Sequence, residues 1–362
     1  MNKHYSLNKI LAKKARYNVI FGERSNGKTY AVLKYGLEQY IKTGKQMAII
    51  RRWQDDFTGK RGQTMFSNLV NNGEIQRLSK GRWTGVRYYA GKWYLIKTEN
   101  EGKDVIQDDT PFCWGFAIST VEHDKSTSYP NITTVLFDEF ISRTQYITDE
   151  FVLFMNVLST IIRDRKDVTI FMCGNTVNKY CPYFREMGLK HVKDMDPGDL
   201  DLYSYGSSGL LVAVEYTEPN KAGKDSDVYF AFDNPKLAMI KGGEWELDIY
   251  PHCPVKYKPN EILFTYFIRF DDVLMQCEIV QHKQLLFTFI HPKTTPLKDD
   301  NRDLIYCTDF DARPNYKRNI LKPCSDIEKK VLSFYAKDKI FYSDNEIGDC
   351  IRNYLIWCGR AK

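Results

Sequence analysis

The stretch "IFGERSNGKTY", residues 20–30, decides how the chain is expected to fold. It overlaps the end of an apolar run, "YNVIFG", and leads into "TYAVLKYGLEQYIKTG", where apolar residues recur at helical spacing. Its glycines and its Lys-Thr pair match G-x-x-x-x-G-K-[ST], a loop whose backbone N–H groups and lysine surround phosphate oxygens and whose hydroxyl binds Mg²⁺. A glycine-rich turn without a ligand is the alternative. The pattern predicts a nucleotide-binding loop made of Gly22, Glu23, Arg24, Ser25, Asn26, Gly27, Lys28 and Thr29.

A second signal is the apolar, β-branched run "ITTVLFDEF", which contains Asp138 and Glu139. In a nucleotide hydrolase the first carboxylate holds the Mg²⁺ shell, and the second orients or deprotonates the attacking water. Alone, the run could be a buried strand with acidic residues at its exposed end. After a phosphate loop, adjacent carboxylates favour an ATPase of the class with an added strand and a catalytic glutamate. A GTPase is disfavoured, because "DEFI" lacks the glycine of D-x-x-G and "NKYC" lacks the aspartate of N-K-x-D.

Polar residues beyond these runs extend the predicted site. Asn175 ends the expected strand "VTIFMCGN" and would sense the γ-phosphate, with Thr176 sharing the task, unless it simply occupies a strand-to-loop turn. Arg163 and Arg165 close an expected helix, either as solvated residues favoured by the helix dipole or as an arginine finger given to a neighbouring subunit's ATP. Lys125 could reach the same interface, and Arg24 could act within its own subunit.

The composition is that of an ordinary globular protein of 362 residues, long enough for two domains, with a formal charge of +6 that permits a nucleic-acid partner. No apolar run approaches the roughly 18–20 residues of a membrane span, so a cytoplasmic location is expected. Nine scattered cysteines without a C-x-x-C pair argue against a disulfide framework and a structural zinc site. The 14% aromatic content is expected to fill a β-rich core.

Three regions are expected along the chain. Up to residue 205, apolar runs alternate with helical patterns, which predicts an α/β domain with a parallel sheet and helices on both faces. Within it, "GVRYYAGKWYLIKTE" is expected to be an inserted hairpin turning at Ala90-Gly91. Residues 206–245 are turn-rich around one short strand, "LLVAVEYT", which predicts a linker region. Residues 246–362 are expected to form a smaller α+β domain.

Together these elements resemble the DNA encapsidation ATPases of small short-tailed phages, the ring motors that pump the genome into a preformed head. The resemblance rests on "FGERSNGKTYA", "AIIRRW", "STSYPNITTVLFDEF" and "LSTIIRDRKDVTIFMCGNT", within about residues 5–190. It implies a P-loop fold of the class with an added strand and a catalytic glutamate, and it implies ATP and Mg²⁺ as cofactors. Lys28, Thr29, Asp138 and Glu139 would act in cis. Arg163 falls on the family's trans-acting arginine, and Lys125 on a second interface cation.

The resemblance also implies partners: double-stranded DNA, further copies of the chain in a homo-oligomeric ring expected to be a pentamer, and the portal of the procapsid. A packaging RNA is a further partner of such motors, although no residue here demands one, and no membrane is implied. The protein would work in the host cytoplasm, transiently at the portal vertex, and be absent from the mature virion. Lys60 and Arg61 are candidate DNA contacts; Lys80, Arg82, Arg87 and Lys92 form a second basic set or a merely solvated face.

The C-terminal region resembles, by position and strand content, the RNase H-like domain of packaging motors. A nuclease of that type needs carboxylates converging on two metals, and the spacing of Asp271, Asp272, Asp309, Asp311, Asp344 and Asp349 shows no convincing triad. A vestigial nuclease with a nucleic-acid-binding and docking role is therefore expected. Two readings compete with a packaging motor: a helicase or partition-type ATPase without a capsid, and a nucleotide-regulated scaffold that hardly turns ATP over.

Overall fold

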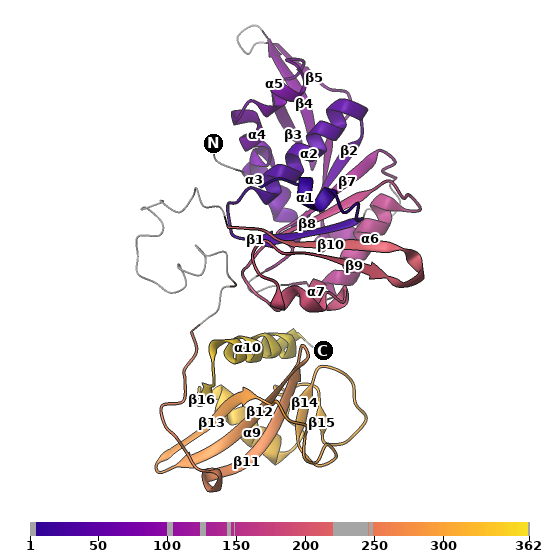
Figure 1. Ribbon diagram of the computed structural model, residues 1–362. Coiled ribbons are helices and arrows are strands. Elements are labelled where there is room, and N and C mark those ends of the chain that lie inside the picture. Colours follow the sequence, from indigo (N-terminus) through magenta and orange to yellow (C-terminus); the bar gives the residue numbers. More distant parts are fainter. Residues whose placement is uncertain are drawn as a thin grey trace. The chain divides into compact units, whose positions relative to one another are not determined.

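The computed structural model describes residues 5–99, 104–123, 128–142, 146–147, 149–219, 245 and 249–360. The chain forms two compact units, Met1–Glu246 and Leu247–Lys362 (Figure 1). Among the helices so described, none is long and apolar enough to cross a membrane.

The first unit is built on a ten-stranded sheet whose central strands run parallel. Their order is β6 (Cys113–Ala117), β2 (Gln46–Arg51), β7 (Ile132–Asp138), β8 (Thr169–Asn175), β1 (Tyr17–Gly22) and β10 (Leu210–Tyr216). The strand β7 ends at Asp138, directly before Glu139, and β8 separates it from β1, the strand that leads into the phosphate loop. This is the added strand that the adjacent carboxylates predict. The carboxyl ends of parallel strands meet at one edge of a sheet, where ligands bind in folds of this kind.

Antiparallel strands extend the sheet on both sides. Beyond β6 lie β4 (Lys92–Glu99) and β3 (Gly85–Tyr89), with β5 (Asp104–Gln107) also paired to β4. The β3–β4 turn has positive φ at Ala90 (45°) and Gly91 (76°), which matches the right-handed twist of a hairpin. The expected inserted hairpin is confirmed, whereas β5 was not predicted. At the other edge, β9 (Leu200–Tyr205) pairs with β10.

Helices cover both faces of this sheet, as predicted. Alternate residues of β1 point to opposite faces, so Val19 and Phe21 enter one core cluster and Ile20 enters the other. The first cluster includes side chains of α6 (Glu150–Ile162) and α7 (Pro182–Glu186). The second includes side chains of α1 (Asn8–Leu11), α2 (Lys28–Thr43), α4 (Ser67–Asn71) and α5 (Glu74–Leu78). Other short helical segments are α3 (Gly59–Thr64), η1 (Gln54–Phe57), η3 (Ile118–His123), η4 (Lys190–Asp194) and η5 (Gly206–Ser208).

The expected boundary at residue 205 is wrong. The run taken for a strand of a linker region is β10, which pairs in parallel with β1 over Val212–Tyr216. Its backbone groups need partners because the strand is buried, and β1 and β9 supply them. Further on, the ring of Trp245 stacks on Phe21 with centroids 5.4 Å apart, so the first unit extends to the end of the expected linker. Residues 220–244 lie outside the described part.

The second unit combines a mixed six-stranded sheet with helices, in keeping with the α+β expectation. Its order is β15 (Tyr316–Lys317), β14 (Ile305–Cys307), β11 (Ile262–Phe270), β12 (Val273–His282), β13 (Leu285–Pro292) and β16 (Ile340–Tyr342). The three central strands form an antiparallel meander, and the outer strands run parallel to their neighbours. The helices are α9 (Asp326–Ala336) and α10 (Asn345–Arg360), and η7 (Pro259–Glu261) precedes β11. An RNase H-like assignment of this unit stays a prediction.

Candidate nucleotide site

The predicted phosphate loop joins β1 to α2 through two glycines that the backbone requires. Gly22 has φ 149° and Gly27 has φ 93°, both in the region that favours glycine. A Cβ at Gly22 would also collide with the Thr217 side chain. Asn26 holds the loop from within: its Nδ2 donates to Thr217 Oγ1 at 2.6 Å, and its carbonyl accepts from the Tyr5 N–H at 3.1 Å. The loop is therefore anchored by contacts with residues at both ends of the first unit.

Lys28 is a buried cation among neutral oxygen atoms. Its Nζ donates to the carbonyls of Glu23 at 2.6 Å and Gly22 at 3.3 Å, and to the amide oxygens of Asn26 at 3.2 Å and Asn175 at 3.3 Å. Burial lowers the pKa of Lys28 from 10.5 to about 8, against the smaller opposing effect of nearby acidic groups. Phosphate oxygens would supply the close anion that these acceptors do not.

Thr29, Asp138 and Glu139 come together as the sequence predicts. Thr29 Oγ1 donates to Asp138 Oδ1 at 2.7 Å, and Glu139 follows directly in a turn with φ 58°. A hydroxyl and a carboxylate oxygen are hard oxygen ligands of the kind Mg²⁺ takes. The residues present therefore fit the ion that the phosphate loop implies, with Thr29 and Asp138 as the groups to hold it.

Arg51, at the end of β2, binds both carboxylates and was not predicted as a site residue. Its guanidinium donates to Asp138 Oδ2, and its Nη1 lies 3.4 Å from Glu139 Oε2. The next residue, Arg52, is buried against Glu150. The sequence does contain a signal for both residues. Two adjacent arginines follow the apolar run of a strand expected to be buried, and arginines are rarely buried without a partner.

A cavity of about 440 Å³ opens over these groups. It is within the usual size of small-molecule sites, and its wall is formed by Ser25, Asn26, Gly27, Lys28, Thr29, Tyr30, Asn68, Asn72, Asp138, Glu139, Cys173, Gly174 and Asn175. A second cavity of about 420 Å³ shares Thr29, Tyr30 and Asn68 with the first and reaches Arg51 and Arg61. The two adjoining cavities leave room for a nucleotide beside the loop.

Asn175 lies at the site from the end of β8. Its Oδ1 accepts a hydrogen bond from Lys28 Nζ, so it is within reach of whatever Lys28 binds. The following Thr176 is buried, and its N–H donates to the Gly22 carbonyl at 3.1 Å. Thr176 thus ties β8 to the loop through its backbone, while the Asn175 side chain lines the cavity.

The remaining predicted cations are distributed around the unit. Arg163 is exposed at the end of α6 and has φ 50°. Among the described residues that line the two cavities, Arg163 does not occur. Arg165 caps the same helix by donating to the carbonyls of Ile161 at 2.9 Å and Tyr129 at 3.2 Å. Arg24 is exposed on the loop, and Lys125 lies outside the described residues.

The candidate DNA contacts Lys60 and Arg61 are exposed on α3. Arg61 also lines the second cavity, and its Nη1 lies 3.9 Å from Asp56 Oδ1. In the hairpin set, Arg87 donates to Gln107 at 3.3 Å, Lys92 lies over the Trp114 ring at 4.7 Å, and Arg82 lies over the Trp83 ring at 5.2 Å. Lys80 is exposed. A DNA contact by either set stays a prediction.

The six aspartates considered above as nuclease candidates in the second unit do not converge on one site. Asp271 and Asp272 form the β11–β12 turn, and Asp309 is exposed. Asp344 accepts from the Ile347 N–H at 2.9 Å, and Asp349 accepts from the Tyr250 hydroxyl at 3.1 Å.

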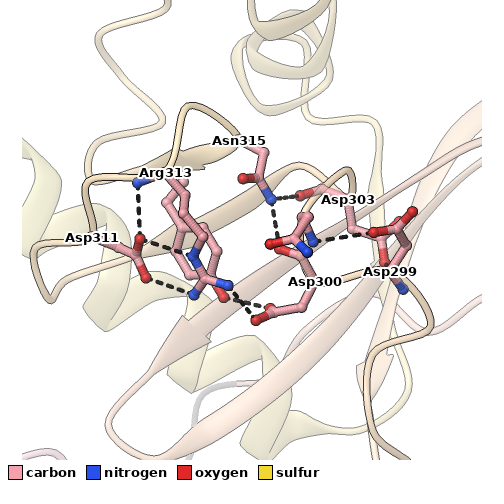
Figure 2. Close-up of polar contacts among 8 residues, drawn as sticks. Asp299, Asp300, Asp303, Asp311, Arg313 and Asn315 are labelled. Atoms are coloured by element: carbon pink, nitrogen blue, oxygen red, sulfur yellow. Dashed lines mark hydrogen bonds and ion pairs between the residues drawn. The ribbon is translucent and has the colours of Figure 1, made fainter.

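Figure 2 shows Arg313 between Asp300 and Asp311, and this arginine lowers the pKa of Asp311 to about 2. Within the described ranges, no three His, Cys, Asp or Glu side chains gather as a metal site would require.

The added strand, the phosphate loop and the adjacent carboxylates define a P-loop NTPase of the class with a catalytic glutamate. A family model described as podovirus DNA encapsidation protein (Gp16) matches residues 1–196, and the chain belongs to this family. The geometry and the comparison agree with the resemblance drawn from the sequence motifs.

Curated relatives come from phages of Bacillus. The chain is 27% identical over 184 residues to the DNA packaging protein of Bacillus phage phi29, which covers 50% of this chain and 48% of the relative. It is 26% identical over 235 residues to the DNA packaging protein of Bacillus phage B103, which covers 59% of this chain and 66% of the relative. The chain thus spans about half the length of the phi29 relative.

Two solved structures share the fold over nearly the whole chain. One is the Phi-28 gp11 DNA packaging motor, at a TM-score of 0.52 and 18% identity, covering 100% of this chain and 99% of that one. The other is the bacteriophage Phi-29 viral genome packaging motor assembly, at a TM-score of 0.56 and 18% identity, covering 99% and 98%.

Proposed function

We propose that this chain is an ATP-driven translocase that packages double-stranded viral DNA into a preformed procapsid. The observation that carries the proposal is the convergence of Lys28, Thr29, Asp138, Glu139 and Asn175 on one cavity at the carboxyl edge of a parallel sheet. Membership of the podovirus DNA encapsidation family supports DNA packaging as the work that hydrolysis drives. The arrangement suits ATP hydrolysis because each step has a group of the right chemistry in place.

The roles follow from the contacts. The loop N–H groups and Lys28 would bind the β- and γ-phosphates, and Thr29 and Asp138 would hold Mg²⁺, whose charge would offset that of the phosphates. Glu139 orients the attacking water and accepts its proton. Asn175, hydrogen-bonded to Lys28, reads the presence of the γ-phosphate.

The motor would assemble as a homo-oligomeric ring, expected to be a pentamer, on the portal of the procapsid in the host cytoplasm. Arg163 is exposed at the end of α6, which suits an arginine finger given to a neighbouring subunit. Lys125 is proposed as a second cation at that interface. Lys60 and Arg61 are the proposed DNA contacts, and the second unit is proposed as an RNase H-like docking domain that also binds DNA or a packaging RNA.

The test of hydrolysis is Glu139→Gln, which keeps the size of the side chain and removes its basicity. We expect ATP binding to persist and steady-state phosphate release to fall by about 10²-fold or more. Wild-type protein is measured with and without double-stranded DNA and with procapsids. Unimpaired turnover in the variant would remove Glu139 from the mechanism, and absence of ATP hydrolysis by wild-type protein under all three conditions would refute the motor itself.

The trans role of Arg163 is tested by mixing subunits. Arg163→Ala subunits retain Glu139, whereas Glu139→Gln subunits retain Arg163, so a mixed ring contains some complete interfaces. Partial recovery of ATPase activity is expected at intermediate ratios. Mixed rings that form, as shown by co-purification, yet stay inactive at every ratio would refute the shared site.

A further inference from the structure

Arg52, the residue after β2, is a buried arginine that the nucleotide cavities do not account for. It is 7% exposed, and neither cavity wall includes it among the described residues. Its guanidinium binds Glu150 through two bonds, Nε to Oε2 at 2.7 Å and Nη2 to Oε1 at 2.8 Å. The same guanidinium donates from Nη1 to the Glu139 carbonyl at 3.3 Å and from Nη2 to the Phe140 carbonyl at 3.0 Å. Arg52 therefore holds two consecutive backbone carbonyls, those of Glu139 and Phe140.

The partner of Arg52 is itself held in place. Glu150, the first residue of α6, is 3% exposed and accepts hydrogen bonds from the Tyr183 hydroxyl at 2.8 Å and from the Ile147 N–H at 2.7 Å. Each carboxylate oxygen thus has two donors. The Arg52 guanidinium also lies 4.9 Å from the ring centroid of Tyr146. We call Arg52, Glu150 and Tyr183 the clamp.

The turn that the clamp holds needs external support. Glu139 has φ 58°, a conformation that residues other than glycine rarely adopt. Its side chain is 64% exposed and is contacted by Arg51, whose Nη1 lies 3.4 Å from Oε2, so the backbone at Glu139 sets the region that the carboxylate can reach. One further backbone bond, from the Phe140 N–H to the Cys173 carbonyl at 3.3 Å, holds the turn on its other side.

Stability alone is a weak reason for such a cluster. Removing two charges from water is costly, and apolar residues of similar volume often stabilise a core at least as well as a buried ion pair does. What an arginine offers in addition is a planar fork that can bind a carboxylate and two carbonyls in one fixed geometry. That geometry is useful where a backbone must be held in an uncommon conformation.

We propose that Arg52 and Glu150 are positioning residues that aim the Glu139 carboxylate at the attacking water. This inference rests on the proposed ATPase function, because it assigns Arg52 and Glu150 to the same site. They act through the backbone of Glu139 and touch neither substrate nor metal.

The test is Arg52→Lys, which keeps the charge but lacks the fork. We expect kcat for ATP to fall about 10- to 100-fold, because misplacing a reacting group by about 1 Å costs about that much. KM and the affinity for a non-hydrolysable ATP analogue should change less than about 2-fold, since the phosphate loop is untouched. Glu150→Gln serves as a second variant with the same expectation, should Arg52→Lys fail to fold. Tyr40→Phe, which removes a hydroxyl bonded to Asp108 and Thr110, is the control and should keep the wild-type kcat.

A double variant distinguishes positioning from general loosening. If Arg52 acts through Glu139, adding Arg52→Lys to Glu139→Gln should slow single-turnover hydrolysis no further. A double variant slower by the product of the two single effects would overturn the proposal, as would a kcat for Arg52→Lys within 2-fold of wild type. Loss of kcat and nucleotide affinity in equal proportion would also overturn it. Wild-type protein without ATPase activity would instead refute the proposed function on which it rests.

Discussion

Replacing Lys28 by Met should make the nucleotide-free protein more stable at neutral pH while abolishing nucleotide binding. Burial lowers the pKa of Lys28 from 10.5 to about 8. Since each pKa unit corresponds to about 1.4 kcal/mol, keeping this amine charged in the folded chain costs about 3 kcal/mol. Met has nearly the same length and no charge. The variant also loses the hydrogen bonds from the amine to neutral oxygens, which should offset about 1 to 2 kcal/mol of this gain. The free energy of unfolding should therefore rise by a net of about 1 to 2 kcal/mol at pH 7.

The pH dependence is the sharper part of this prediction. The pKa of Lys28 is lower in the folded chain than in the unfolded chain, so the unfolded chain binds more protons between pH 8 and 10.5. The free energy of unfolding of the wild type therefore rises with pH across that window, whereas the variant has no such group. Between pH 7 and pH 10 the stability difference should move by about 2 to 3 kcal/mol in favour of the wild type, so the advantage of the variant should disappear or reverse. Titrations common to both chains cancel in the difference.

The assay is urea unfolding followed by tryptophan fluorescence at several pH values. Five of the six tryptophans (53, 83, 93, 114 and 245) belong to the first unit, so the signal reports chiefly on the unit that holds Lys28. Lys42→Met, at an exposed lysine on the same helix, is the control and should show no pH-dependent difference. A difference between wild type and Lys28→Met that stays constant to within about 0.5 kcal/mol from pH 7 to 10 would refute the reasoning. Saturating ATP analogue with Mg²⁺, at about 100 times its Kd, should stabilise only the wild type, by about 2.7 kcal/mol.

Two further substitutions probe the carboxylate side of the site. Arg51→Gln removes the cation between Asp138 and Glu139, so the free energy of unfolding should fall by about 3 kcal/mol in the absence of divalent ions, and millimolar Mg²⁺ should restore part of that stability. Denaturant unfolding in EDTA and in Mg²⁺ measures both values, and an equal loss of stability in the two conditions would contradict this prediction. Gly174→Ala would place a Cβ 2.8 Å from Ile141 Cγ1 and 2.9 Å from Phe140 Cε1. This substitution should lower the free energy of unfolding by about 1 to 3 kcal/mol and disturb the turn that follows Glu139. Thermal unfolding measures the loss, and a Tm equal to that of the wild type would show that the packing has more room than these distances indicate.

Several features of the fold and site could be predicted because their signals are local. The phosphate loop is a contiguous motif between a strand and a helix, and the hairpin turn at Ala90-Gly91 is marked by a glycine, which tolerates positive φ. The run that ends in Asp138-Glu139 is a buried strand followed by charges. In each case neighbouring residues carry the whole pattern, since periodicity and turn chemistry act over a few residues.

Other features were missed because they depend on partners far along the chain. The strand β10 looks like part of a linker until β1, nearly two hundred positions earlier, pairs with it. Arg51 and Arg52 look like two ordinary charges until the fold brings them to Asp138, Glu139 and Glu150. Nothing within a short window distinguishes a buried, clamped arginine from a solvated one.

By itself, therefore, the sequence determined that this chain has a phosphate loop, two adjacent carboxylates after a buried strand, and a resemblance to phage DNA encapsidation ATPases. Only the tertiary structure decided that β10 pairs with β1, that Lys28 is a desolvated cation, and that of two consecutive arginines one binds the carboxylates of Asp138 and Glu139 and the other binds the backbone of Glu139. The physical reason is that motifs are written in the order of residues, whereas burial and charge pairing depend on which distant residues the packed sheet brings within a few ångströms.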